Sequence, residues 1–129
     1  MPQLSLAWTV ADGPGGNQDD PRWEDVDSRL QTLKARSGTV ALDLVNPPEI
    51  GPQGLQVFCD QGNFLLMLSE LTADDHEVRG YTNASADHDG VGVLGNAWDG
   101  RMVCQDFEIV RTVFAELFTS GDVARTLLS

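Results

Sequence analysis

The two histidines of the chain are the first residues to consider as chemical groups, because each lies in a short acidic segment. His76 belongs to "DDHE" and His88 belongs to "DHD". Imidazole and carboxylate groups bind zinc and similar ions, so Asp74, Asp87 and Asp89 could complete a metal site if the two segments meet in space. The spacing matches neither HExxH, nor CxxC, nor a calcium-binding loop. Solvated turns are therefore the preferred interpretation, and we predict no metal and no cofactor.

Nucleophilic catalysis has less support in the sequence. Cys104 as a nucleophile would need a histidine base and positive surroundings, but its neighbours Val103 and Asp106 offer the opposite. There is no GxSxG motif, and Ser37, Ser69 and Ser120 lie at element ends, where serine is typical of turns and caps. A pair of catalytic carboxylates carries no weight, since 20 acidic residues always permit some pair. The sequence therefore predicts no catalytic residue and no enzyme.

The acidic segments have a second interpretation, as contacts for another protein. Neighbouring like charges cost stability unless water screens them or a partner uses them. One interpretation is solvated turns, and the other is a negative face that meets a basic protein. Trp98 likewise either anchors an interface or packs onto the second predicted helix. The candidate partner-binding residues are the acidic groups and the residues of one predicted turn: Asp74, Asp75, Glu77, Asp87, Asp89, Trp98 and Asp99.

Composition limits the classes of partner. The 129 residues predict one domain over residues 1–129. Eight basic and 20 acidic residues give a net charge of −12, which disfavours nucleic acid and anionic membrane surfaces and favours basic partners. Improved solubility is the simpler explanation of this acidity. We find neither a signal peptide nor an apolar run long enough to span a membrane, so we expect a cytoplasmic protein with reduced cysteines.

The elements that would position these residues are mostly strands, with one helix near each end of the chain. Alternating apolar residues predict strands at 4–10 and 38–46, and a hairpin over 54–71. Shorter strands are expected at 78–83 and on either side of a tight Asp99-Gly100 turn. Residues 11–20 contain four Gly or Pro residues and predict a flexible acidic loop.

The two predicted helices have readable ends. The first is capped by Asp20 and terminated by Gly38, and the second is capped by Asp106 and terminated by Gly121. The order predicts an α+β fold, a mostly antiparallel β-sheet with two main helices packed on one face. Both faces of the 55–68 hairpin are apolar, so something should cover part of its second face. A homodimer through that face stays open, as does a disulfide between Cys59 and Cys104.

Taken together, several segments resemble a family of small bacterial proteins of unknown function. The segments include "SLAWTV", "WEDVDSRL", "GTVALD", "VRGYTN" and "WDGRMVCQDFEIV". The chain is also similar to the immunity proteins of polymorphic toxin systems, especially the Imm1-like group, in size, in element order and in the close of its final helix. That resemblance implies a compact cytosolic protein that binds a cognate toxin domain, often a nuclease with a basic cleft, and blocks its active site. It supplies no binding residues.

The first hypothesis is therefore an acidic immunity protein that occludes the active site of a secreted bacterial toxin. The alternative is an accessory domain without catalysis that binds a small ligand or a metal through His76, His88 and nearby carboxylates. An enzyme of unrecognised type is the third hypothesis, and it is the weakest because the sequence lacks a nucleophile–base pair or a cofactor loop.

Overall fold

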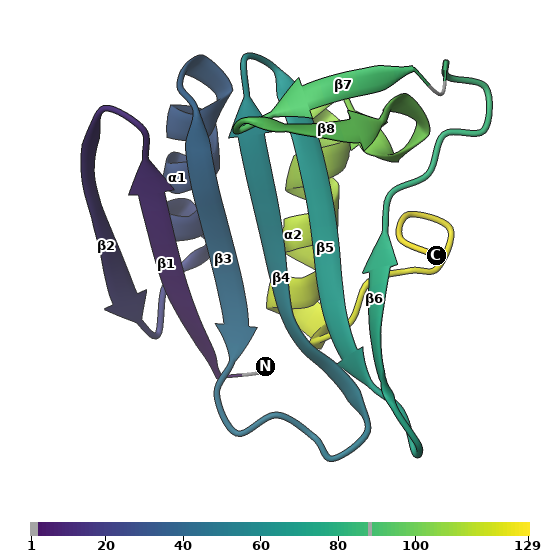
Figure 1. Ribbon diagram of the computed structural model, residues 1–129. Coiled ribbons are helices and arrows are strands. Elements are labelled where there is room, and N and C mark those ends of the chain that lie inside the picture. The colour runs from purple at the N-terminus through teal and green to yellow at the C-terminus, as the bar shows by residue number, and fades with distance from the viewer. Residues whose placement is uncertain (1–2, 88) are drawn as a thin grey trace.

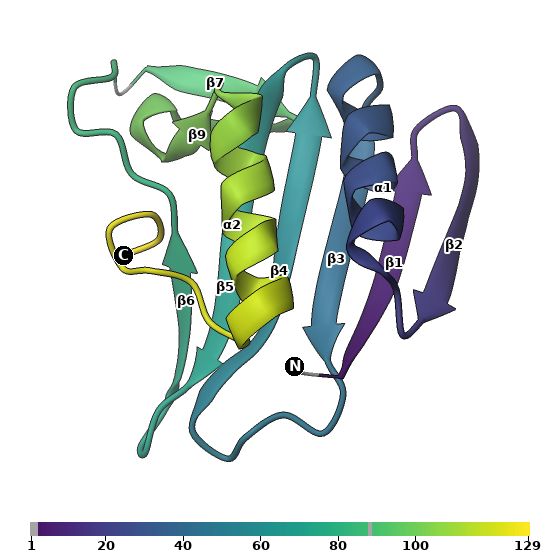
Figure 2. The ribbon, with the colours of Figure 1, turned by 180° about the vertical axis from the view of Figure 1, so that it is seen from behind.

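The main sheet of the protein is antiparallel and carries two helices on one of its faces. The computed structural model describes residues 3–87 and 89–129 (Figure 1). The sheet follows the order β2-β1-β3-β4-β5-β6, and α1 and α2 lie side by side on one of its faces, in front of the sheet in Figure 2. This arrangement confirms the predicted α+β fold. The bounds are β1 (Leu4–Val10), β2 (Gly13–Asp19), α1 (Trp23–Ala35), β3 (Gly38–Leu44), β4 (Gly51–Asp60), β5 (Asn63–Leu71), β6 (His76–Gly80) and α2 (Phe107–Ser120).

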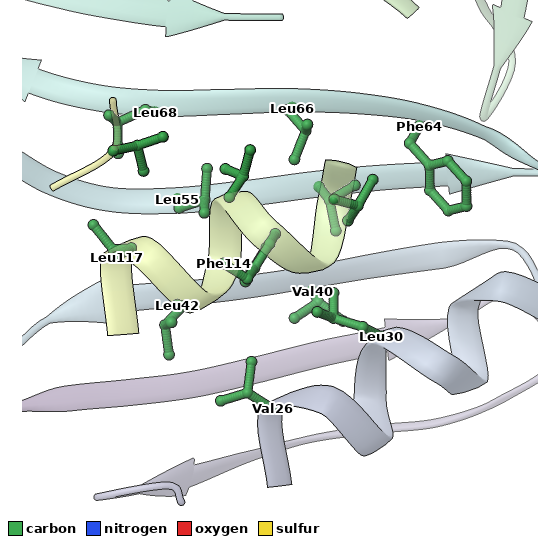
Figure 3. Packing of buried hydrophobic residues seen from close by; sticks show 14 of the residues in the cluster. Val26, Leu30, Val40, Leu42, Leu55, Phe64, Leu66, Leu68, Phe114 and Leu117 are labelled. Atoms are coloured by element: carbon green, nitrogen blue, oxygen red, sulfur yellow. The ribbon is translucent and has the colours of Figure 1, made fainter. Parts of the chain in front are cut away.

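The main core fills the space between the sheet and the helices (Figure 3). Alternate residues of each central strand point to the helices, such as Leu55 on β4 and Leu66 on β5, and both are essentially inaccessible to solvent. They belong to the same core as Leu30 of α1 and Phe114 of α2. On each helix the buried residues recur at helical spacing and form one apolar stripe. Neither helix within the described residues has the length and apolar character needed to cross a bilayer.

Residues 11–20 are not the flexible loop predicted for them. Gly13–Asp19 form the edge strand β2, which pairs with β1. The glycines are compatible with this strand because the Trp8 indole lies flat against it. A Cβ atom on Gly16 would stand 2.6 Å from Cζ2 of Trp8. Arg29 covers the other side of that ring, 3.7 Å from its centroid. The glycines that resemble a turn in the sequence therefore allow Trp8 to pack closely on strand β2. The pattern of apolar residues gives no sign of this strand.

The second helix has the predicted ends, and the first does not. The Asp106 carboxylate accepts the Glu108 N–H at 3.0 Å, and Gly121 ends α2 in the left-handed conformation with φ 80°. In α1 the cap position is Arg22, whose N–H is accepted by Asp25 at 2.8 Å, so the expected Asp20 cap is wrong. Helix α1 ends before Arg36, and Gly38 instead begins β3.

A second, smaller core lies on the sheet face opposite the helices, which we call the open face. The hairpin of β7 (Gly90–Val93) and β8 (Asn96–Asp99) crosses one end of this face (Figure 1). Its Val93 is buried against Leu65 of β5 and Val103 of β9 (Val103–Cys104). The prediction that something covers the second face of the central hairpin is confirmed.

The turn of this small hairpin differs from the prediction. The chain reverses at Leu94 and Gly95, whose φ values are 50° and 86°. Asp99 instead caps the short 3-10 helix η1 (Gly100–Met102) by accepting the Arg101 N–H at 2.9 Å. The Asp99-Gly100 pair has turn composition, but it begins a helical turn rather than joining two strands.

The segment after α2 is fastened to β6 by one buried arginine. Arg79 is only 2% exposed. Its guanidinium donates to the carbonyl oxygens of Val123 at 2.6 Å and Leu128 at 2.9 Å. It also forms ion pairs with Asp122 at 3.0 Å and Glu70 at 3.3 Å. Loss of these contacts would leave a buried cation without partners, which is costly. They therefore hold residues 122–128 at the edge of the sheet.

Candidate partner-binding surface

The first predicted acidic group lies on the turn between β5 and β6. Asp74, Asp75 and Glu77 are all exposed. Asp75 has a structural task, because its carbonyl accepts the Thr72 N–H at 2.8 Å and its carboxylate accepts the His76 N–H at 2.7 Å. Asp74 and Glu77 carry no comparable bond among the described residues. This turn therefore offers two accessible negative charges without a shaped site.

The second predicted group lies at the other end of the sheet. Asp87 accepts the Asp89 N–H at 3.1 Å, and Asp99 binds Arg101 with a shortest separation of 2.6 Å. The hydrogen bonds that Asp99 accepts from the guanidinium, together with its negative charge, raise the pKa of Arg101. Gly100 allows residues 87–89 to approach η1 closely, because a Cβ atom at this position would lie 2.3 Å from the carbonyl oxygen of Asp87. The structure thus brings Asp87, Asp89 and Asp99 together.

The two acidic groups do not form one cluster. His76 pairs with Leu71 at one end of β5, and Val103 pairs with Leu65 near the other end. Six residues of strand separate those positions, which corresponds to roughly 20 Å. Figure 1 shows the β5–β6 turn and the β7–β8 hairpin at opposite ends of the sheet.

This separation bears on the proposed metal site. His76 and the carboxylates of Asp87 and Asp89 lie at opposite ends and cannot share an ion. His88 falls outside the described residues. Within residues 3–87 and 89–129, no three histidine, cysteine or acidic side chains are grouped as metal ligands.

Trp98 lies on β8, half-buried over the open face. It packs against the small core of Leu65, Val93 and Val103 on the face opposite α2, so the predicted packing onto the second helix is wrong. With Phe58 and Leu94 it lines an apolar slot of about 220 Å³. Leu94 donates its N–H to Asp60 at 3.0 Å, which fixes the tip of the hairpin to the sheet.

A polar pocket of about 400 Å³ lies beside the same hairpin, where residues 81–87 approach η1 and β9. Asp87 and Asp106 provide carboxylates, and Val91 and Val103 provide apolar walls. Tyr81 also lines it. Burial, with the negative charge of Asp106 added, raises the pKa of Tyr81, so its hydroxyl stays protonated near neutral pH. We call β7, β8, η1 and residues 81–87 the hairpin end.

Sequence reasoning missed several residues of this pocket. Tyr81, Asn83 and Gln105 were not selected, and Asp106 was interpreted only as a helix cap. Asp106 does cap α2, and the same position places its carboxylate at the pocket. Its nearness to the predicted Asp99 turn in sequence was the one available signal. The approach of residues 81–87 to η1 is a tertiary contact that no local pattern specifies.

The cysteines do not form a reactive pair. Both thiols are free and buried. Burial raises the pKa of Cys59 to about 11, and its thiol donates to the Leu33 carbonyl at 3.0 Å. Burial also raises the pKa of Cys104. Both groups therefore remain protonated thiols in the core, a state unsuited to nucleophilic attack.

Residues 8–127 match a family of unknown function (DUF6911). The chain belongs to this family. No curated protein matches the sequence. A solved structure, "Crystal structure of a hypothetical protein from Neisseria gonorrhoeae", is similar with a TM-score of 0.78 and 13% sequence identity, covering 95% of this chain and 90% of that chain. At this identity the similarity concerns the fold alone, and the fold of this DUF6911 member is therefore shared with a distant protein.

Proposed function

We propose that this protein is an acidic inhibitor that binds a basic partner protein, and that the partner is a secreted bacterial toxin whose active site it covers. The role is that of an immunity protein in the cytoplasm, without catalysis of its own. The proposal is supported by the distribution of charge and by the shape of the hairpin end. Resemblance to immunity proteins supplies the class of partner.

The pairing of the arginines is the observation that carries the proposal. Six arginines each lie within 3.9 Å of a carboxylate oxygen of the same chain: Arg22, Arg36, Arg79, Arg101, Arg111 and Arg125. Arg29 stacks on Trp8, and Lys34 lies 5.1 Å from the Phe107 ring. Each basic group thus has an acidic or aromatic neighbour in the same chain, although the side chains of Arg22, Arg36 and Arg125 are more than half exposed. The excess of carboxylates therefore sets the sign of the surface. Such a surface attracts a basic protein over a distance of roughly 10 Å.

The hairpin end combines features that protein interfaces share. A half-buried tryptophan, an apolar slot and a pocket with carboxylates lie within one small hairpin. Aromatic anchors beside charged groups are typical of residues that dominate binding energy. The β5–β6 turn has the charges but neither hollow. We therefore assign the main contact to the hairpin end.

The test is co-expression with the product of the adjacent upstream gene, followed by size-exclusion chromatography and a growth assay. We expect co-elution and rescue of growth. Two double variants locate the contact with equal loss of charge: Asp87→Asn with Asp89→Asn at the hairpin end, and Asp74→Asn with Glu77→Gln at the turn. The first should weaken binding roughly tenfold, and the second should change it little.

Two results would contradict this proposal. Failure of both co-elution and growth rescue would remove the immunity role. Equal weakening by the two double variants would show that net charge alone drives association and that the hairpin end is not the contact.

A further inference from the structure

The open face carries a hollow of about 330 Å³ that is lined by residues of β3, β4, β5 and the edge strand β6. One transverse row of residues builds it. Asp43 of β3 pairs with Gly54 of β4, Gly54 pairs with Ser69 of β5, and Ser69 pairs with Val78 of β6. Because paired residues point to the same side of a sheet, these positions face one another across Gly54.

Gly54 leaves the space that the Asp43 carboxylate occupies. A Cβ atom on Gly54 would lie 2.1 Å from Oδ1 of Asp43. The carboxylate therefore leans across the neighbouring strand into the hollow. Ser69 stands on the opposite side, with its Oγ 2.5 Å from Nε2 of His76. The backbone of Gly54 thus forms the floor of the hollow between the Asp43 carboxylate and the Ser69 hydroxyl.

Asp43 forms no ion pair with another side chain among residues 3–87 and 89–129. Throughout this described part of the structure, no arginine or lysine lines the hollow. Asp43 is exposed to solvent, and the neighbouring atoms that partly desolvate its carboxylate raise its pKa. A carboxylate held in this way gains most from a donor supplied by another molecule.

The other lining residues suit the stem of a long basic side chain. Met67 and Val78 give apolar contact, and Val78 is 58% exposed. Lysine and arginine carry such apolar stems below their charged heads. Gln53 donates to the carbonyl oxygens of Pro48 and Gly51, both at 3.0 Å, which holds the adjacent loop in place. The hollow is at the lower limit of ligand pockets, roughly 300 Å³, and therefore fits one side chain.

We propose that this hollow binds the guanidinium or ammonium group of a basic side chain from the partner protein, with Asp43 accepting its hydrogen bonds. The source of the side chain rests on the proposed function, whereas the preference for a cation rests on Asp43 alone. Met67 lines both this hollow and the apolar slot beside Trp98. One partner surface laid on the open face would therefore reach both places.

The test uses a probe that does not depend on the partner. Amide chemical shifts of the isotope-labelled protein are followed by NMR while N-acetyl-arginine amide is added, and then its neutral isostere N-acetyl-citrulline amide. We expect the arginine probe to shift the amides of Asp43, Gly54 and Ser69, and the citrulline probe to leave them unchanged.

Three variants show whether the carboxylate is responsible. Asp43→Asn removes the charge, and Gly54→Ala keeps the charge but displaces the carboxylate from the hollow. Both should weaken binding of the arginine probe roughly tenfold. Glu24→Gln removes one charge from the helix side and should bind as the wild type does. Dispersed amide spectra confirm that each variant is folded.

Binding of the arginine probe by Asp43→Asn or Gly54→Ala as tightly as by the wild type would overturn the inference. So would equal binding of the citrulline probe, or shifts scattered over the acidic surface. These results are independent of co-elution with a toxin. Probe binding without any protein partner would retain the cation site and remove the protein source of the side chain.

Discussion

Asp43 and Gly54 show how a single absent side chain gives a neighbouring charge its position. The carboxylate is partly desolvated over Gly54, and its pKa is raised above the ordinary value of 3.8. The folded state therefore disfavours the charged form of Asp43 relative to the unfolded chain. The free energy that folding loses to this charge is absent below pH 3.8, where the group is protonated in both states, and appears as the pH rises through the raised pKa.

We therefore expect Asp43→Asn to stabilise the fold at neutral pH. The gain should be small, on the order of 0.5 kcal/mol, because solvent contact screens the charge of Asp43. It should shrink as the pH falls through the raised pKa and vanish near 3.8. Urea unfolding at several pH values measures it. A loss of stability at neutral pH would mean that the carboxylate has a stabilising contact within the fold.

Residue roles were predictable where they depend on near neighbours in sequence. The Asp106 cap follows from its place before an apolar helix, and its bond to Glu108 confirms it. Ser69 was interpreted as a turn residue, whereas it faces Asp43 across Gly54 through the register of three strands. Register between distant strands is set by the whole sheet, so no local pattern could join these residues.

At the scale of elements, the ends of α2 are specified locally and its position is specified by contacts with α1. Arg111 of α2 binds Asp27 of α1 at 2.8 Å, and Phe118 packs on Trp23 with ring centroids 5.8 Å apart. The helix ends at Gly121 because φ is 80° there, and its N–H bonds to the Leu117 carbonyl. A left-handed residue at this point lets the chain turn back toward β6.

Gly121→Ala should lower the free energy of unfolding by about 1–2 kcal/mol, because a side chain disfavours the left-handed conformation. Gly92→Ala is the matched control. Gly92 lies in exposed strand β7, and a Cβ atom there would meet no atom within 4 Å. Chemical denaturation of both variants gives the comparison. If the two substitutions had equal effects, the conformation of Gly121 would not be the cause.

The elements themselves were largely predictable, with two informative exceptions. Alternation of apolar residues indicated β1, β3, β4 and β5, since each buries one face against helices. Strand β2 was missed because its glycines serve the packing of Trp8. The turn of the small hairpin was placed at Asp99-Gly100 because that pair has turn composition, whereas Leu94 and Gly95 make the reversal.

At the scale of the whole molecule, the net charge of −12 should govern how fast a basic partner arrives. We expect the association rate to fall roughly tenfold or more between about 0.05 M and about 0.5 M salt, because ions screen the attraction. The dissociation rate should change much less. Stopped-flow mixing with the captured partner measures both rates. An association rate independent of salt would argue against an electrostatic approach.

The two edges of the sheet differ from its middle in a way that concerns behaviour at high concentration. Edge strand β2 contains Pro14, which has no N–H to offer, and several glycines. At β6, Gly80 already exchanges backbone hydrogen bonds with Ser129, at 3.4 and 3.2 Å. Each edge is thus a poor template for a strand of a second copy. Protein produced in excess of its partner should consequently resist fibrillar aggregation and remain dispersed.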